Sequence, residues 1–176
     1  INLDRCAFVN FGRADGGAVS IIANGSSNPF AGIVDITKCT FANNSRNILL
    51  SGVTTGQINV VHISECKGVD QDYSVVSDWG AETPFTSNIT IQRCLWEGTT
   101  TQDIVSGSVA TAWVITDNYF ESSSSGRTIQ FNGASNLGIF VARNFFRKTL
   151  SSGSSLVYFI NANGCKVVSN SSGFGA

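Results

Sequence analysis

The strongest constraint on this sequence is a short pattern that recurs seven times along its 176 residues. The clearest copy is NITIQRCLWEG at residues 88–98, where Ile89 and Ile91 alternate with polar residues as in a half-buried strand. A cysteine or an asparagine occupies the middle of each copy, and we call this position the central column: Cys6, Cys39, Cys66, Cys94, Asn118, Asn144 and Asn170. Neighbouring copies are 24 to 33 residues apart, a period that indicates a repeat architecture.

The positions around the central column keep their chemical character. Three residues before it, every copy has an aliphatic side chain: Leu3, Ile36, Ile63, Ile91, Ile115, Val141 and Val167. Two residues after it, five copies have an aromatic side chain: Phe8, Phe41, Trp96, Phe120 and Phe146. Stacked at about 4.8 Å per coil, such positions form internal ladders in a parallel β-solenoid, whose coils bury their apolar faces against one another. A leucine-rich repeat shares this range of periods but requires a leucine-dense consensus, which is absent here.

A second apolar segment follows each central position after about ten residues. These segments are 18–22, 47–50, 74–76, 103–105, 128–131 and 156–160. Variable stretches at 23–32, 51–57 and 77–88 separate them from the next copy, and any third strand of a coil would lie inside these stretches. We therefore predict an all-β fold, a right-handed single-stranded parallel β-helix of about six to seven coils, with the hand given by the usual crossover rule.

The positions of the five cysteines favour reduced, buried thiols over disulfide bonds or metal ligands. Four of them share the central column, and small buried thiols stacked like the asparagines explain that arrangement, although a disulfide between neighbours is an alternative. A metal site is disfavoured because zinc ligands usually come in close pairs such as CxxC. The asparagines should form a ladder, with each side-chain amide bonded to the next coil. The single histidine, His62, is expected at the surface.

Composition excludes several functions. The net charge is −1 and 13% of the residues are charged, which argues against a nucleic-acid partner or a membrane-surface protein. The longest apolar runs are far shorter than the roughly 18 residues of a membrane span, so we expect no membrane insertion. The chain lacks an initiating methionine and begins within the pattern. We therefore expect residues 1–176 to form one β-helix domain that is a piece of a longer chain.

The alternating strand, the Asn or Cys at the turn and the aromatic residue two places later resemble the parallel β-helix of the pectin-lyase-like superfamily. Within it, the coils rich in Ser, Thr, Asn and Gly and the irregular loops are most similar to those of bacteriophage tailspike proteins. Two motifs of the pectinases are missing. WVITD at residues 113–117 is followed by Asn118 rather than by the histidine of a pectate lyase, and the Gly-His-Gly turn of polygalacturonases does not occur.

The tailspike resemblance implies a homotrimer on an extracellular virion, without a cofactor, that binds a bacterial surface polysaccharide (capsule, O-antigen or exopolysaccharide). It often implies depolymerisation, by glycoside hydrolysis with paired carboxylates more often than by a lyase reaction. Two alternatives remain: a non-catalytic receptor-binding or fibre segment, and an adhesin passenger that is secreted or held at the bacterial surface. A trimer interface would also bury two outward columns that become apolar toward the C-terminus, although a covering loop would do the same. These columns are Lys67, Leu95, Tyr119 and Phe145, and Thr90, Val114 and Phe140.

The candidate catalytic residues are Glu97, Glu121 and Asp103. Glu97 and Glu121 both lie three residues after the central column in successive coils, so their backbones should be about 5 Å apart. Side chains that diverge from there reach the ~5–5.5 Å of a retaining pair or the ~6.5–9.5 Å of an inverting pair. Mutual repulsion would raise the pKa of one carboxyl group to that of a general acid. Asp103 opens the next strand and is expected in the same groove.

The candidate substrate-binding residues lie in the stretch 77–88, where Trp79 would stack on a sugar ring between Asp78 and Glu82. The alternative for all these acidic residues is that they are plain solvated positions at solenoid turns. The active site would then lie at the seam between trimer chains or in residues outside this piece of the chain.

Overall fold

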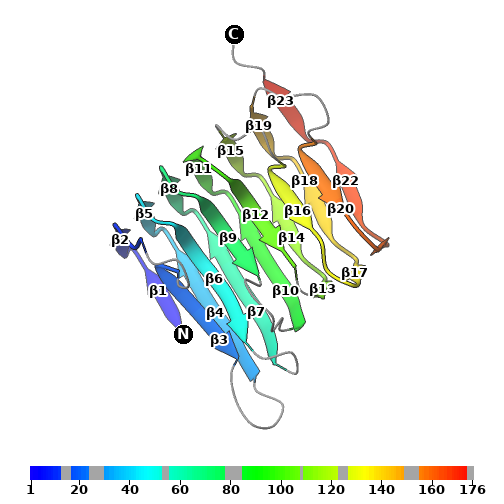
Figure 1. The fold of residues 1–176 in the computed structure, drawn as a ribbon, viewed down its shortest axis with the longest axis horizontal. Coiled ribbons are helices and arrows are strands. Elements are labelled where there is room, and N and C mark those ends of the chain that lie inside the picture. Colours follow the sequence, from blue (N-terminus) through cyan, green and yellow to red (C-terminus); the bar gives the residue numbers. More distant parts are fainter. Residues whose placement is uncertain are drawn as a thin grey trace.

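The computed structural model describes residues 1–12, 17–23, 30–52, 56–77, 85–107, 109–122, 127–148 and 155–173. Within these ranges the chain forms 23 strands and no helix. The strands follow one another in coils that stack from the N-terminal to the C-terminal end (Figure 1). All strand pairs are parallel, so the predicted β-solenoid is confirmed.

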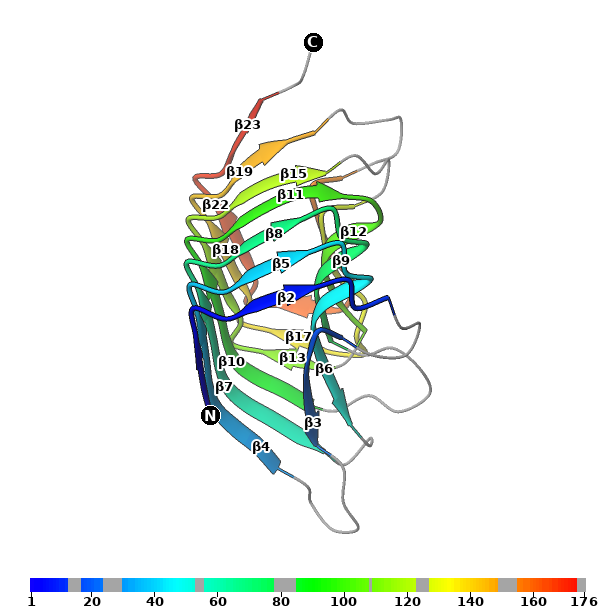
Figure 2. The same ribbon diagram turned by 90° about the vertical axis from the view of Figure 1, so that its left-hand side faces the viewer.

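Three parallel sheets form the walls of the solenoid. Figure 2 shows the second sheet toward the viewer with the first and third sheets on either side. The first sheet contains β1 (Asn2–Asp4), β4 (Phe30–Thr37), β7 (Gln57–Ser64), β10 (Phe85–Gln92), β13 (Ala110–Thr111), β14 (Val114–Thr116), β17 (Asn136–Leu137), β18 (Phe140–Ala142), β21 (Ala162–Asn163) and β22 (Lys166–Val168). The second sheet contains β2 (Ala7–Val9), β5 (Thr40–Ala42), β8 (Lys67–Val69), β11 (Leu95–Thr99), β15 (Tyr119–Ser122), β19 (Phe145–Arg147) and β23 (Ser171–Gly173). The third sheet contains β3 (Val19–Ala23), β6 (Arg46–Gly52), β9 (Tyr73–Ser77), β12 (Gln102–Ser106), β16 (Ile129–Phe131) and β20 (Val157–Phe159).

The strand register agrees with the columns read from the sequence. The seven aliphatic residues that precede the central column are successive Cα partners in the first sheet, from Leu3 to Val167. The aromatic column is in register in the second sheet, where Trp96, Phe120 and Phe146 are at most 1% exposed. The second sheet has seven strands and the third has six, in agreement with a prediction of six to seven coils.

The first sheet begins earlier than the pattern indicates. Strands β4, β7 and β10 start at Phe30, Gln57 and Phe85, inside or at the edge of the stretches that the sequence assigns to loops. In every coil from the second onward, the residue six positions before the central column has a positive φ, so the backbone bends there. This bend interrupts the period-two alternation of apolar and polar residues, and the start of the strand is therefore not visible in the sequence. The bending residues are Ile33, Val60, Asn88, Ala112, Gly138 and Gly164.

The central column is a continuous hydrogen-bonded ladder. Asn118 donates from Nδ2 to Oδ1 of Asn144 at 3.0 Å, and Asn144 donates in the same way to Asn170 at 3.0 Å. Each asparagine also donates to a carbonyl of the preceding coil, as Asn144 does to Ile115 at 2.9 Å. The cysteines make a weaker version of the same contact, since the Cys66 thiol lies 3.5 Å from the Ile36 carbonyl oxygen. All five cysteines are free, as predicted.

The residue before each central position is left-handed in all seven coils, and its side chain lies at the surface. From the second coil to the sixth, opposite charges alternate there: Glu65 lies between Lys38 at 3.9 Å and Arg93 at 3.2 Å. In the next coils Arg143 binds both carboxylate oxygens of Asp117 at 2.8 Å, and this lowers the pKa of Asp117. Mixed charge therefore stabilises a ladder in which like charges would repel.

Candidate functional site on the second sheet

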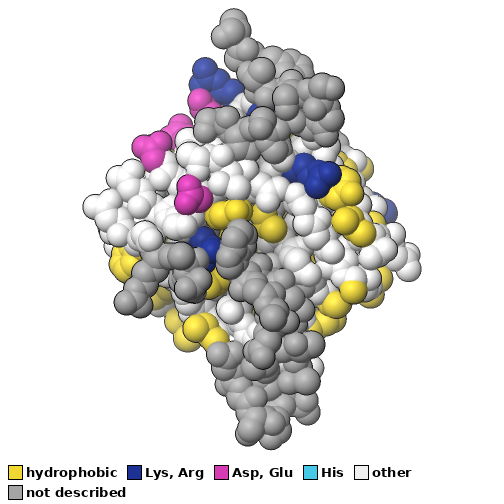
Figure 3. Space-filling view, viewed as in Figure 1, with side chains coloured by type: hydrophobic (Ala, Val, Ile, Leu, Met, Phe, Trp, Pro, Cys, Tyr) yellow, Lys and Arg dark blue, Asp and Glu magenta, His cyan; other side chains and the backbone are white. Residues whose placement is uncertain are grey.

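The outer surface of the second sheet gathers aromatic and charged side chains. Side chains alternate along β11, β15 and β19, so the residues beside the buried aromatic column point outward. We call this surface the second-sheet face and define it by its outward residues: Lys67, Leu95, Glu97, Tyr119, Glu121, Phe145 and Arg147. In Figure 3, acidic side chains gather beside basic ones toward the edge where this sheet lies.

Two aromatic rings form the apolar part of the second-sheet face. Tyr119 and Phe145 are Cα partners, and their rings stack with centroids 5.5 Å apart and planes inclined by 11°. Phe145 is 38% exposed. Its ring lies against Gly173, where an added Cβ would come within 2.9 Å of Cζ. Two aligned rings at a sheet surface provide a flat apolar platform.

Both candidate glutamates lie on this face and are Cα partners, as the sequence indicates. Each glutamate forms a salt bridge with a basic side chain: Glu97 lies 3.4 Å from Lys67 Nζ, and Glu121 lies 3.2 Å from Arg147. The Tyr119 hydroxyl also donates to Glu121 at 2.8 Å. Burial and this hydrogen bond raise the pKa of Tyr119. The carboxylates are thus organised by ion pairs along the face, and their role in catalysis stays a prediction.

Asp103 does not lie on the second-sheet face. It is fully buried where the second sheet turns into the third, and its Oδ1 accepts hydrogen bonds from Thr99 at 2.5 Å and Ser74 at 3.3 Å. Burial raises its pKa to about 7, although the two hydrogen bonds and the charge of Lys148 oppose this rise. A buried carboxyl group without access to the outer face cannot act together with Glu97 and Glu121. The expectation of a shared groove therefore fails for Asp103.

A row of buried polar residues surrounds Asp103, and the sequence reading missed it. We call it the polar corner, and its residues are at most 8% exposed: Asn44, Asn47, Gln71, Ser74, Thr99, Asp103, Ser122, Thr128 and Lys148. Gln71 connects two members of the row, since its Nε2 donates to Thr99 at 2.7 Å and to Ser74 at 3.3 Å. The available signal was the recurrence of polar residues at one point of each coil, shortly after the aromatic column.

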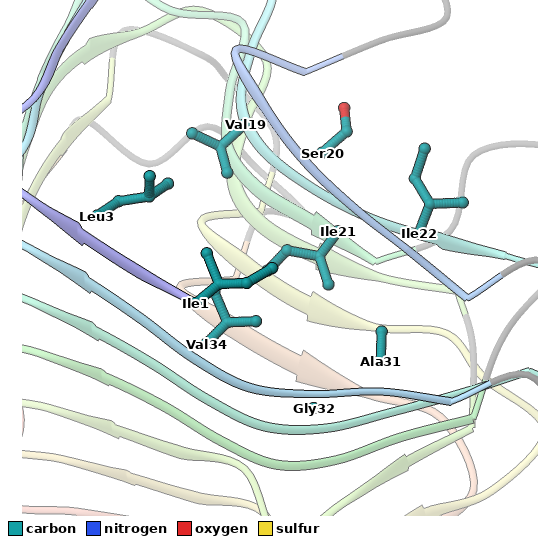
Figure 4. A pocket seen from close by; sticks show the side chains of 9 residues that line it. All are labelled: Ile1, Leu3, Val19, Ser20, Ile21, Ile22, Ala31, Gly32 and Val34. Carbon is teal, nitrogen blue, oxygen red and sulfur yellow. The ribbon is translucent and has the colours of Figure 1, made fainter.

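Hollows among the described residues include an apolar one and a polar one. One, of about 570 Å³, is the apolar interior at the N-terminal end, lined by side chains such as Ile1, Leu3 and Val34 (Figure 4). The other, of about 500 Å³, is polar and lies where β5 and β8 end. It is lined by Gly12, Asn43, Asn44, Ser45, Asp70 and Asp72. The Asp72 carboxylate there accepts hydrogen bonds from Ser45 at 3.1 Å and Thr100 at 2.6 Å.

The remaining candidate residues are placed as follows. Asp78, Trp79 and Glu82 lie outside the described residues. His62 is at the surface, as expected, and its Nδ1 lies 3.1 Å from Asp35 in the preceding coil. Over the described ranges, no group of three or more His, Cys, Asp or Glu side chains is arranged to hold a metal ion. The same part of the chain contains no helix that could cross a membrane.

The fold and its outer face define an all-β parallel solenoid that presents an aromatic and charged surface. Comparisons of the chain with protein-family models, with curated proteins and with solved structures found no match.

Proposed function

We propose that this solenoid binds a bacterial surface polysaccharide on its second-sheet face. The observation that carries the proposal is the stacked pair Tyr119 and Phe145, bordered by the ion-paired Glu121 and Arg147. The apolar side of a sugar ring packs on aromatic rings, and its hydroxyl groups bond to carboxylates and guanidinium groups at the border. The polar hollow beside Asp70 and Asp72 lies at the end of the same sheet and offers further acceptors.

Hydrolysis of the bound chain is the second candidate, and one observation favours it. Glu97 and Glu121 are in register in adjacent strands, so their backbones are one strand spacing apart, about 4.8 Å. From this backbone spacing, side chains that diverge slightly would bring their carboxyl groups to the ~5–5.5 Å of a retaining glycosidase, and side chains that diverge further to the ~6.5–9.5 Å of an inverting one. A substrate would have to displace Lys67 or Arg147 before either carboxylate acts on it. Binding is therefore the function that the geometry supports better.

The wider setting is also part of this proposal. The β-helix and its resemblance to tailspikes support a homotrimeric, extracellular virion protein. A fibre segment without enzymatic activity, or a bacterial surface adhesin, would use the same face for binding alone. The two experiments below separate binding from cleavage.

Binding is tested with Tyr119→Ala and Phe145→Ala against a panel of purified bacterial capsules, O-antigens and exopolysaccharides. We expect each variant to lose about tenfold or more in affinity for the polysaccharide that the unchanged protein retains, since a lost stacking contact weakens binding on that scale. Phe140→Ala is the matched control, because Phe140 faces outward on the first sheet instead. Equal loss in all three variants, or no retained polysaccharide, would contradict the proposal.

Cleavage is tested separately with Glu97→Gln and Glu121→Gln. Release of reducing ends from the retained polysaccharide should fall by at least 100-fold in both variants if the pair is catalytic. Unchanged release in both variants excludes this pair. If the unchanged protein binds without releasing ends, the domain is a binding module.

A further inference from the structure

The outer surface of the third sheet carries an arginine stacked on a tyrosine. The guanidinium carbon Cζ of Arg127 lies 3.6 Å from the centre of the Tyr158 ring. Tyr158 is the middle residue of β20, between Val157 and Phe159, which pack against the core, so its own side chain points outward. In Figure 3, a basic side chain lies against hydrophobic ones on the side where β16 and β20 lie. The cation–π contact fixes the guanidinium across two successive coils.

No carboxylate in the described part of the chain neutralises Arg127. None of the ion pairs within these ranges involves it, whereas Arg93 and Arg143 each pair with an acidic residue of a neighbouring coil. The sequence stretches directly before Arg127 and before the coil segment of β20, residues 123–126 (SSSG) and 149–154 (TLSSGS), contain no acidic residue. Arg127 is partly exposed. Since one flat side of its guanidinium lies on the ring, the N–H groups at its edge can donate to an acceptor from solution.

Two glutamines add neutral polar groups to the same surface. Gln130 is the Cα partner of Tyr158, and both side chains are partly exposed. Gln130 accepts a hydrogen bond at Oε1 from Gln102 Nε2 at 2.5 Å. Because this bond uses the oxygen of Gln130, its Nε2 remains as a donor, and Oε1 of Gln102 remains as an acceptor. The surface thus combines one fixed cation with amide groups that can donate and accept.

This set of groups favours a planar anion that carries hydroxyl groups. A carboxylate accepts two parallel N–H bonds from the edge of a guanidinium, and the stack on Tyr158 orients Arg127 before a ligand arrives. One positive charge among neutral amides matches the single negative charge of a carboxylate, whereas a phosphate monoester carries more charge than this surface compensates. The amides of Gln102 and Gln130 suit the hydroxyl groups that surround the carboxylate of a sugar acid.

We propose that Arg127, Tyr158 and Gln130 form a binding site for sugar acids such as uronates. The carboxylate of the sugar accepts two hydrogen bonds from Arg127, and Nε2 of Gln130 donates to a neighbouring hydroxyl group. The site lies on the third sheet and uses no residue of the second-sheet face. It therefore goes beyond the polysaccharide binding proposed above and can be tested independently of it.

Ligand titration followed by NMR tests the chemistry of the site. Glucuronate, its neutral methyl ester, acetate and inorganic phosphate are added to the isotope-labelled chain, and the side-chain signals of Arg127 and Tyr158 are followed. We expect glucuronate to shift these signals and its ester to bind at least about tenfold more weakly, because the ester lacks the charge. Acetate should bind about threefold more weakly or less, since it lacks hydroxyl groups for the amides.

Three results of the titration would overturn the proposal. Signals of Arg127 and Tyr158 that do not move with glucuronate would exclude the site. Equal affinity for glucuronate and its ester would exclude recognition of the carboxylate. Acetate or phosphate that binds as tightly as glucuronate would exclude a sugar acid as the ligand.

Variants assign the binding to these residues. Arg127→Ala should weaken glucuronate binding about tenfold or more, and Arg127→Lys about fivefold, because lysine keeps the charge but loses the planar pair of donors. Lys166→Met is the matched control, since it removes one exposed positive charge from the first sheet, and it should leave the affinity unchanged. Tyr119→Ala on the second-sheet face should also leave it unchanged. Equal losses in Arg127→Ala and Lys166→Met, or no loss in Arg127→Lys, would contradict the assignment.

Discussion

Gly68 leaves room for the ring of Trp96 in the next coil. A Cβ on Gly68 would lie 2.5 Å from Cε3 of that ring and 2.8 Å from Nδ2 of the buried Asn47. Phe41, two coils away from Trp96, consequently comes within 6.4 Å of it between ring centroids. The break in the aromatic column at Gly68 is therefore filled by the larger indole of the neighbouring coil.

We predict from this contact that Gly68→Ala destabilises the fold. The added methyl group forces the Trp96 ring or Asn47 to move inside a closely packed core, which costs about 1–3 kcal/mol. Gly12→Ala is the matched control, because nothing lies within 4 Å of a Cβ at that position. Chemical denaturation of both variants measures the difference, and an equal effect at the two glycines would contradict this account.

The asparagine ladder gives a second prediction, for Asn144→Ala. Asn144 accepts at Oδ1 from the backbone and side chain of Asn118, both at 3.0 Å, and donates to the Ile115 carbonyl and to Asn170. Loss of these buried bonds, at about 1 kcal/mol each, should lower the free energy of unfolding by about 2–4 kcal/mol. Asn144→Cys should cost less than Asn144→Ala, since a cysteine in this column still reaches the carbonyl of the preceding coil, as Cys66 does. A cysteine variant no more stable than the alanine variant would disprove this ranking.

The ladders were predictable because they repeat with a single chemical character. Ile36, Ile63 and Ile91 lie at one distance from the central column, and stacking them needs only the strand spacing. The same logic places Glu97 beside Glu121. The spacing of residues in the sequence does not show whether a side chain at the turn between two sheets points inward or outward. The turn between the second and third sheets directs Asp103 inward, although its position at the start of a strand fits an outward residue equally well.

The ion pairs of the second-sheet face were also beyond the sequence reading. Lys67 reaches Glu97 in the next coil, but Lys67 is one residue after its central position and Glu97 is three after its own. This diagonal contact depends on rotamers rather than on register. The repeat pattern therefore predicts which residues are in register in adjacent coils, but it does not predict contacts between residues at different positions of the repeat.

Burial of Asp103 predicts how stability depends on pH. Its pKa of about 7 in the folded state lies above the ordinary value of 3.8, so between these values the folded protein retains a proton that the unfolded chain has lost. The contribution of Asp103 to stability is thus full below pH 4 and falls as the pH rises to 7, by up to about 1.4 kcal/mol per pH unit. Asp103→Asn removes this pH-dependent contribution to the free energy of unfolding. The free energy of unfolding of the variant relative to the unchanged protein should rise from pH 4 to pH 7 and then level off, and a constant difference would contradict it.

Lys148 should set the upper limit of that pH window. It is 4% exposed, burial lowers its pKa, and its positive charge favours the ionised form of Asp103. In Lys148→Met the charge disappears, so the pKa of Asp103 should rise further and the decline in stability should extend above pH 7. Denaturation measured from pH 5 to pH 9 detects the shift. The double variant with Asp103→Asn is the control: it lacks the carboxyl group and should show no such window, so a pH-dependent loss of the same size in the double variant would assign the effect to another group.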